Sequence, residues 1–138
     1  MRSLGVRAVM LDGESGSGIP DGRDILRIAY APHGYLFSKA SAIVHAGGIG
    51  TSARAICAGR PMLVVPFAYD QPDNALRLVR LGVALTLGRN SYTARSAAKA
   101  IGALLADARY STNARRAAQI VQSEDGTGAA CDALERYL

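Results

Sequence analysis

Short apolar runs alternate with segments of helical periodicity along most of the chain, and this alternation constrains the fold more than any other feature. The runs that we predict as strands are residues 7–11, 25–30, 42–45, 62–67 and 83–87. The segments that we predict as helices are residues 36–42, 51–58, 72–82, 93–107, a stretch around 114–121, and 127–137. Strands that alternate with helices predict a doubly wound α/β fold, so we expect a Rossmann-like, mostly parallel sheet with a helical C-terminal tail.

Two of these elements have clear patterns. Residues 62–67 (MLVVPF) are apolar on both faces, as in a parallel strand that helices cover on both sides. The helix predicted over 93–107 has one apolar face at helical spacing, made of Ala97, Ile101, Leu104, Leu105 and Ala108.

Turn residues set the other boundaries. Either Thr51 or Gly50 can cap the start of the helix over 51–58, and Gly59 suits the left-handed position after its end. Residues 13–22 are rich in Gly, Ser and Pro and are predicted as a loop.

Composition limits the classes of function. A length of 138 residues with 49% hydrophobic residues suits one globular domain over residues 1–138. The net charge of +5 rests on scattered arginines with few aromatics, which favours a small phosphate-bearing ligand over nucleic acid. Cys57 and Cys131 form no metal-ligand spacing, so we expect no metal, and we predict buried free thiols in a cytoplasmic protein.

Three polar segments each follow a predicted strand. They are YAPH at residues 30–33, HAGGIGT at 45–51 and FAYDQPDN at 67–74. In open α/β sheets, ligands bind outside the carboxyl ends of the strands. The fold can therefore bring all three segments to one edge, where we expect the functional site.

The segment HAGGIGT has the chemistry of an anion site. Its glycines let a ligand approach the backbone, and the following helix directs free N–H groups and its positive dipole end to that place. Phosphate is the usual ligand there, with Thr51 and His45 as further donors, His45 more strongly if protonated. Alternatively, the glycines serve packing and His45 is a core histidine. The pattern G-x-G-x-x-A from Gly48 to Ala53 also matches a dinucleotide-binding fingerprint.

The third segment places a carboxylate beside an amide. Asp70 and Gln71 suit the adjacent hydroxyls of a sugar, although Asp70 can instead cap the helix that follows. Tyr30 can stack on a base or be an ordinary half-buried strand aromatic.

Together these residues resemble the C-terminal half of the UDP-glycosyltransferase superfamily with the GT-B fold, especially bacterial antibiotic, lipid and sterol glucosyltransferases. That family carries HxGGxGT, AG-x-P and V-P-F…DQ-x-x-N-A, and this chain reads HAGGIGT, AGRP and VVPFAYDQPDNA. YAPHGYLF, LGVAL and SEDG also fit, so the likeness extends over residues 7–138.

The resemblance implies a site for the donor diphosphate. His45, Gly48, Gly50 and Thr51 would hold the diphosphate of a UDP- or dTDP-hexose, and the helix dipole with His45 would stabilise the leaving nucleotide. Transfer to a hydroxyl of a lipid or small molecule would invert the anomeric carbon and need neither metal nor cofactor.

The resemblance also implies sites for the rest of the donor. Tyr30 and His33 would lie by the base and ribose, and Asp70 and Gln71 would hold the sugar hydroxyls. Some relatives carry a glutamate for the ribose hydroxyls where this chain has Ala53, so the choice between UDP and dTDP stays open.

The resemblance implies parts that this sequence lacks. We expect the first strand of the domain and the whole N-terminal acceptor domain, with its catalytic base, to be missing, so no catalytic residue is assigned. The chain would then be a weakly active or inactive donor half, one subunit of a two-chain enzyme, or a non-catalytic nucleotide-binding module. An unpaired strand edge would make the chain self-associate or pair with another chain.

Overall fold

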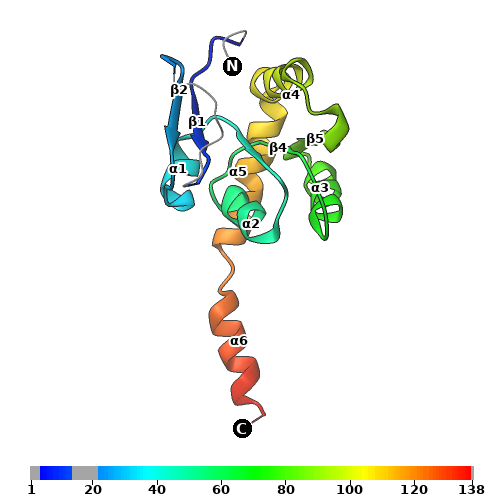
Figure 1. The fold of residues 1–138 in the computed structure, drawn as a ribbon. Helices are drawn as coiled ribbons and strands as arrows, with labels where there is room; N and C mark the ends of the chain where they lie inside the picture. The colour runs from blue at the N-terminus through cyan, green and yellow to red at the C-terminus, as the bar shows by residue number, and fades with distance from the viewer. Residues whose placement is uncertain (1–3, 14–21, 138) are drawn as a thin grey trace.

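The computed structural model describes residues 4–13 and 22–137 (Figure 1). The predicted loop over 13–22 therefore lies mostly outside the described residues. The strands are β1 (Ala8–Leu11), β2 (Ile25–Ile28), β3 (Ile43–His45), β4 (Met62–Val64) and β5 (Ala84–Thr86). The helices are α1 (His33–Lys39), α2 (Ile49–Cys57), α3 (Gln71–Arg80), α4 (Ala94–Ala106), α5 (Ala108–Gln122) and α6 (Gly126–Glu135), with a 3-10 turn η2 (Arg89–Ser91).

The strands form two parallel sheets. β1 pairs with β2, and β4 lies between β3 and β5. In the second sheet, Leu63 stands opposite Val44 on one side and Leu85 on the other. The described residues contain no hydrogen-bonded ladder between the two sheets. The fold is the expected parallel α/β class, with two sheets where the alternation suggested one.

The core is built on both faces of β4, whose three residues are completely buried. Because successive side chains of a strand point to opposite faces, Met62 and Val64 enter one hydrophobic cluster and Leu63 enters another. The first cluster takes side chains from α1, α2, α3 and α5, and the second takes them from α4. Helices therefore cover both faces of the three-stranded sheet, as the apolar pattern of MLVVPF predicted.

Three helices begin two or more residues earlier than predicted, and one of them is α5, which begins at Ala108 rather than near residue 114. α1 begins at His33 rather than at residue 36, and α2 begins at Ile49 with Gly48 as its N-cap, so neither Thr51 nor Gly50 caps it. The end of α2 is as expected, since Gly59 has φ +63°. A Cβ there would lie 3.3 Å from Cβ of Ala118, so the glycine also allows α2 to pack closely on α5.

Some expected burial is absent. Leu105 is 40% exposed although Ile101 and Leu104 on the same helix are buried. The prediction of buried thiols was wrong, because Cys57 and Cys131 are both exposed. The first lies on α2 and the second on α6, and neither side chain faces a core cluster.

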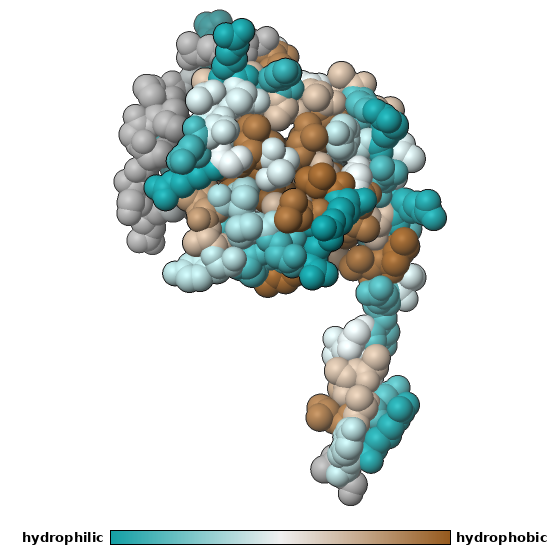
Figure 2. Space-filling model, turned by 90° about the vertical axis from the view of Figure 1, so that its right-hand side faces the viewer, coloured by the Kyte–Doolittle hydropathy of each residue, from teal (hydrophilic) through white to brown (hydrophobic). Residues whose placement is uncertain are grey.

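Two regions lie outside the core. No side chain of β1 or β2 belongs to either cluster, and Val9, Leu11 and Leu26 remain 43%, 37% and 59% exposed. α6 has no buried residue and extends away from the rest of the chain (Figure 1). Figure 2 shows it from the side, with hydrophobic and hydrophilic side chains on different flanks. In the described part of the chain, no helix is long and apolar enough to cross a membrane.

Candidate functional site

The turn between β3 and α2 contains glycines with different roles. Gly47 has φ +92°, and a Cβ there would lie 2.8 Å from Cγ1 of Val64 and 3.2 Å from the carbonyl oxygen of Gln71. Packing of the turn therefore requires this glycine. Gly48 and Gly50 have nothing within 4 Å of a Cβ position, so they leave open space outside the turn. Gly47 is therefore needed for packing of the turn, whereas Gly48 and Gly50 allow a ligand to approach the backbone closely.

The first turn of α2 borders this open space. Its first intrahelical hydrogen bond is donated by the N–H of Ser52 to the carbonyl of Gly48, at 2.9 Å. The N–H groups of residues 49–51 precede that bond and lie at the positive end of the helix dipole. The N-terminus of α2 is therefore suited to an anion.

His45 stands at the end of β3, beside the turn. Its Nδ1 accepts a hydrogen bond from the N–H of Gly47 at 3.0 Å, so the proton of the neutral ring is on Nε2. Nε2 is buried and has no hydrogen-bond partner among the described residues. Burial lowers the pKa of His45 from 6.5 to about 4. His45 is therefore a neutral donor at pH 7, and the protonated form considered from the sequence is disfavoured in the free chain.

The loop before α3 is shaped by Gln71. Its Oε1 accepts hydrogen bonds from the N–H groups of Phe67, at 2.8 Å, and Ala68, at 3.2 Å. The amide oxygen is thus occupied, while the amide nitrogen donates no hydrogen bond within residues 4–13 and 22–137. Asp70 is the N-cap of α3 without a side-chain capping bond, so the capping explanation is wrong for its carboxylate. Tyr69 in this loop is 95% exposed with φ 58°, a strained backbone conformation for tyrosine.

Asn74 joins this loop to the glycine turn. Its Nδ2 donates to the carbonyl of Gly47 at 2.9 Å and to Oδ2 of Asp70 at 2.7 Å. The first of these bonds connects residues that are 27 positions apart in the sequence. Two of the three predicted segments are therefore held side by side. Asn74 belongs to the motif VVPFAYDQPDNA, but the motif alone predicted no role for it.

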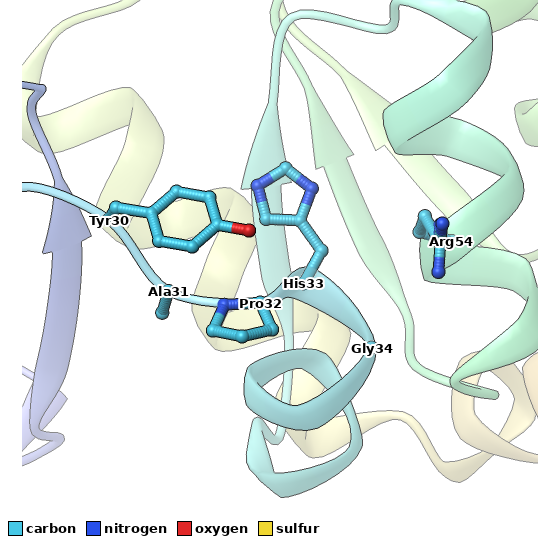
Figure 3. Close-up of a pocket in the computed structure, with 6 residues that line it drawn as sticks. All are labelled: Tyr30, Ala31, Pro32, His33, Gly34 and Arg54. Atoms are coloured by element: carbon cyan, nitrogen blue, oxygen red, sulfur yellow. The ribbon is translucent and has the colours of Figure 1, made fainter.

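The YAPH segment at residues 30–33 borders a hollow of about 300 Å³ between the start of α1 and α2 (Figure 3). The residues that line it are Tyr30, Ala31, Pro32, His33, Gly34 and Arg54. His33 is the first residue of α1, and its ring stacks on Phe37 at a centroid distance of 4.7 Å. Tyr30 is 79% exposed.

Arg54 is the lining residue that α2 contributes to this hollow, and the sequence analysis missed it. It lies three residues after Thr51, so the available signal was its position on the helix that the glycine turn begins. The 30–33 segment thus meets α2 one turn beyond Gly50. All three predicted segments lie around α2 or its preceding turn, but the expectation of one sheet edge was wrong, because residues 30–33 follow a strand of the other sheet.

Comparison with known proteins places this geometry in a family. Residues 8–129 match the family model described as erythromycin biosynthesis protein CIII-like, C-terminal domain. The chain is 34% identical to an O-mycaminosyltylonolide 6-deoxyallosyltransferase of Streptomyces fradiae, over 95% of this chain and 31% of that protein. It is 37% identical to a sterol 3-beta-glucosyltransferase of Aspergillus terreus, over 88% of this chain and 9% of that protein.

Solved structures agree with the sequence comparisons. The glycosyltransferase of kitacinnamycin superposes with a TM-score of 0.87 and 26% identity, over 96% of this chain and 35% of that one. A spinosyn rhamnosyltransferase complexed with thymidine diphosphate superposes with a TM-score of 0.85 and 26% identity, over 95% and 36% of the two chains. This chain therefore spans about a third of the length of the solved structures and of its bacterial relative.

Proposed function

This chain belongs to the erythromycin biosynthesis protein CIII-like C-terminal domain family of GT-B glycosyltransferases, and we propose that it binds the nucleotide-sugar donor of a hexosyl transfer to a hydroxyl. The observation that carries the proposal is the buried Nε2–H of His45, which has no partner in the described part of the chain and lies beside the open first turn of α2. A buried donor without a partner costs free energy, and a phosphate oxygen would satisfy it.

The donor diphosphate lies at the glycine turn in this proposal. Nε2–H of His45, the hydroxyl of Thr51 and the free N–H groups of α2 donate to it, and Gly48 and Gly50 leave the space that it needs. As the bond to the sugar breaks, negative charge grows on the leaving diphosphate. Fixed donors and the helix dipole stabilise that charge, so this part of the reaction needs no metal.

The sugar and the nucleoside occupy the two neighbouring segments. Asp70 accepts hydrogen bonds from sugar hydroxyls, and the free amide nitrogen of Gln71 donates to them. Tyr30 and His33 lie by the base and ribose in the hollow beside α2. Transfer with inversion requires a base that deprotonates the acceptor hydroxyl, and we assign that base to an acceptor-binding domain that is not among these 138 residues.

The nucleotide that we favour is thymidine diphosphate. A solved structure at 26% identity is complexed with thymidine diphosphate. In addition, Ala53 offers no carboxylate to the ribose hydroxyls, which makes recognition of the 2′-hydroxyl of UDP harder.

We place the protein in the cytoplasm, where a reducing environment would keep the exposed Cys57 and Cys131 free.

Calorimetric titration of the purified chain with dTDP, UDP and NAD tests this function. We expect dTDP to bind more tightly than UDP, NAD not to bind, and His45→Ala to weaken dTDP binding by roughly tenfold or more, as expected for loss of a charge-assisted hydrogen bond. Leu76→Ala, at an exposed position of α3, is a control that should bind as the unchanged chain does. Absence of dTDP and UDP binding would overturn the proposal, and NAD binding would restore the dinucleotide alternative.

A second candidate function is that of a subunit that acts with a separate acceptor-domain chain. The exposed apolar side chains of Val9, Leu11 and Leu26 on β1 and β2 favour it, because such surface often marks a contact with another chain. Activity restored by adding the partner would support it.

A further inference from the structure

We propose that Arg54 is a donor-binding residue that holds the phosphate nearest the nucleoside and so selects a nucleoside diphosphate over a nucleoside. The inference rests on the proposed function, because it places the nucleotide between the hollow at Tyr30 and His33 and the glycine turn. It adds a cationic residue to a site that the motifs describe only through neutral and acidic side chains.

Arg54 lies between the two places proposed for the nucleotide, which are the hollow at Tyr30 and His33 and the glycine turn. Figure 3 shows it on α2, across the hollow from Tyr30 and with His33 between them. Its Nη1 is 3.9 Å from the position of a Cβ on Gly34, so the guanidinium lies over the start of α1. A nucleotide with its base by Tyr30 and its diphosphate at the glycine turn would pass this guanidinium.

Helix geometry also relates Arg54 to the glycine turn. Residues four positions apart share a helix face, and side chains of a helix lean toward its N-terminus. Arg54 is four positions after Gly50, so its stem extends along the face on which Gly50 presents no side chain. Arg54 therefore lies on the same face of α2 as Gly50, one turn further along the helix.

Arg54 has no partner within the described residues. Neither a hydrogen bond nor an ion pair of its guanidinium is found there, whereas Arg60 donates to the carbonyl of Ser38 and Arg77 pairs with Asp73. The lining of the hollow contains no carboxylate that could neutralise it. Because a guanidinium stays charged in proteins and matches phosphate oxygens in pairs, an anionic phosphate is the ligand it fits.

The test compares the binding of dTDP and of thymidine to four forms of the whole chain. Calorimetry measures the binding of dTDP, and displacement of bound dTDP measures the binding of thymidine. The forms are the unchanged chain, Arg54→Gln, Arg54→Lys and Arg116→Gln, an exposed α5 residue whose loss changes the net charge equally. We expect Arg54→Gln to weaken dTDP roughly tenfold and leave thymidine unchanged, because only the diphosphate meets the guanidinium. Arg54→Lys should be intermediate, and the salt dependence of dTDP binding should fall in Arg54→Gln but not in Arg116→Gln.

The outcomes separate this inference from the proposed function. If the unchanged chain binds dTDP and His45→Ala weakens it, but Arg54→Gln binds as Arg116→Gln does, the role of Arg54 is wrong and the proposed function stands. Equal weakening of thymidine and dTDP by Arg54→Gln also overturns the phosphate contact. If the unchanged chain binds no nucleotide, both proposals fail together.

Discussion

At the scale of single residues, His45 combines a structural cost with a binding role. Its Nδ1 fixes the glycine turn through the N–H of Gly47, while its Nε2 stays buried and without a partner in the described part of the chain. A core histidine would be expected to satisfy both nitrogens. The unsatisfied one is therefore the feature that separates a ligand-binding histidine from a merely packed one.

The burial of His45 predicts how stability depends on pH. Burial lowers its pKa to about 4, whereas in the unfolded chain it takes up a proton near pH 6.5. Between these values the unfolded state binds more protons, so acidification favours unfolding. We expect this residue alone to lower the free energy of unfolding by about 2 kcal/mol from pH 7 to pH 5.

Urea unfolding of the ligand-free chain at a series of pH values measures this effect. His45→Gln should remove that part of the loss, because glutamine does not titrate. His33→Gln is the matched control and should retain it, since His45 stays in place. An equal pH dependence in His45→Gln and the unchanged chain would contradict the assigned burial effect.

At the scale of elements, different glycines of the β3–α2 turn serve folding and binding. Gly47→Ala puts a methyl group 2.8 Å from Cγ1 of Val64 at positive φ, and we expect it to destabilise the chain by about 2–4 kcal/mol. Gly50→Ala fills open space in the first turn of α2 and replaces a glycine within a helix, so it should leave stability unchanged or raise it by up to about 1 kcal/mol.

The same pair of variants tests the ligand face. Gly50→Ala should weaken dTDP binding roughly tenfold, because its methyl group occupies the space proposed for the diphosphate. Urea unfolding and calorimetry together measure the two effects. If Gly50→Ala binds dTDP normally, the open side of the turn is not the binding face. If Gly47→Ala is as stable as the unchanged chain, the turn relaxes more than its contacts suggest.

The elements also show what local pattern can and cannot predict. The helix after Thr93 was predicted well because its apolar residues recur at helical spacing, and β4 was predicted from an unbroken apolar run, although it ends at Val64 rather than at Phe67. The early starts of α1 and α2 were missed because His-Gly and Gly-Ile-Gly have low helix propensity. Burial of Phe37, Ser52 and Ala55 in tertiary contacts outweighs that propensity.

In the candidate site too, local sequence patterns predicted some features and missed others. The glycine turn and the loop at Asp70 were recognisable because their chemistry is contiguous in sequence. The bond from Asn74 to Gly47 and the position of Arg54 beside His33 depend on contacts between distant segments. A local sequence pattern holds no information about such contacts, so the roles of these residues were found only in the structure.

At the scale of the whole molecule, the two parallel sheets leave strand edges unpaired within the described chain. Each strand other than β4 has a hydrogen-bonded neighbour on one side only. Unpaired edges with apolar side chains are templates for pairing with another chain, and β1 and β2 carry such side chains outside the core. The split between the sheets was not predictable from the sequence, because alternation fixes the elements but not which strands pair.

We therefore expect the isolated chain to self-associate through β1 and β2 as its concentration rises. Leu26→Lys should reduce the association, because a lysine on a strand edge opposes pairing, and Leu26 is 59% exposed, so the folded chain tolerates the change. Leu76→Lys on α3, with 51% exposure and the same added charge, should associate as the unchanged chain does. Light scattering across a wide concentration range measures the mass. A single-chain mass at every concentration would contradict the expectation, and equal effects of the two lysines would attribute the association to net charge rather than to the strands.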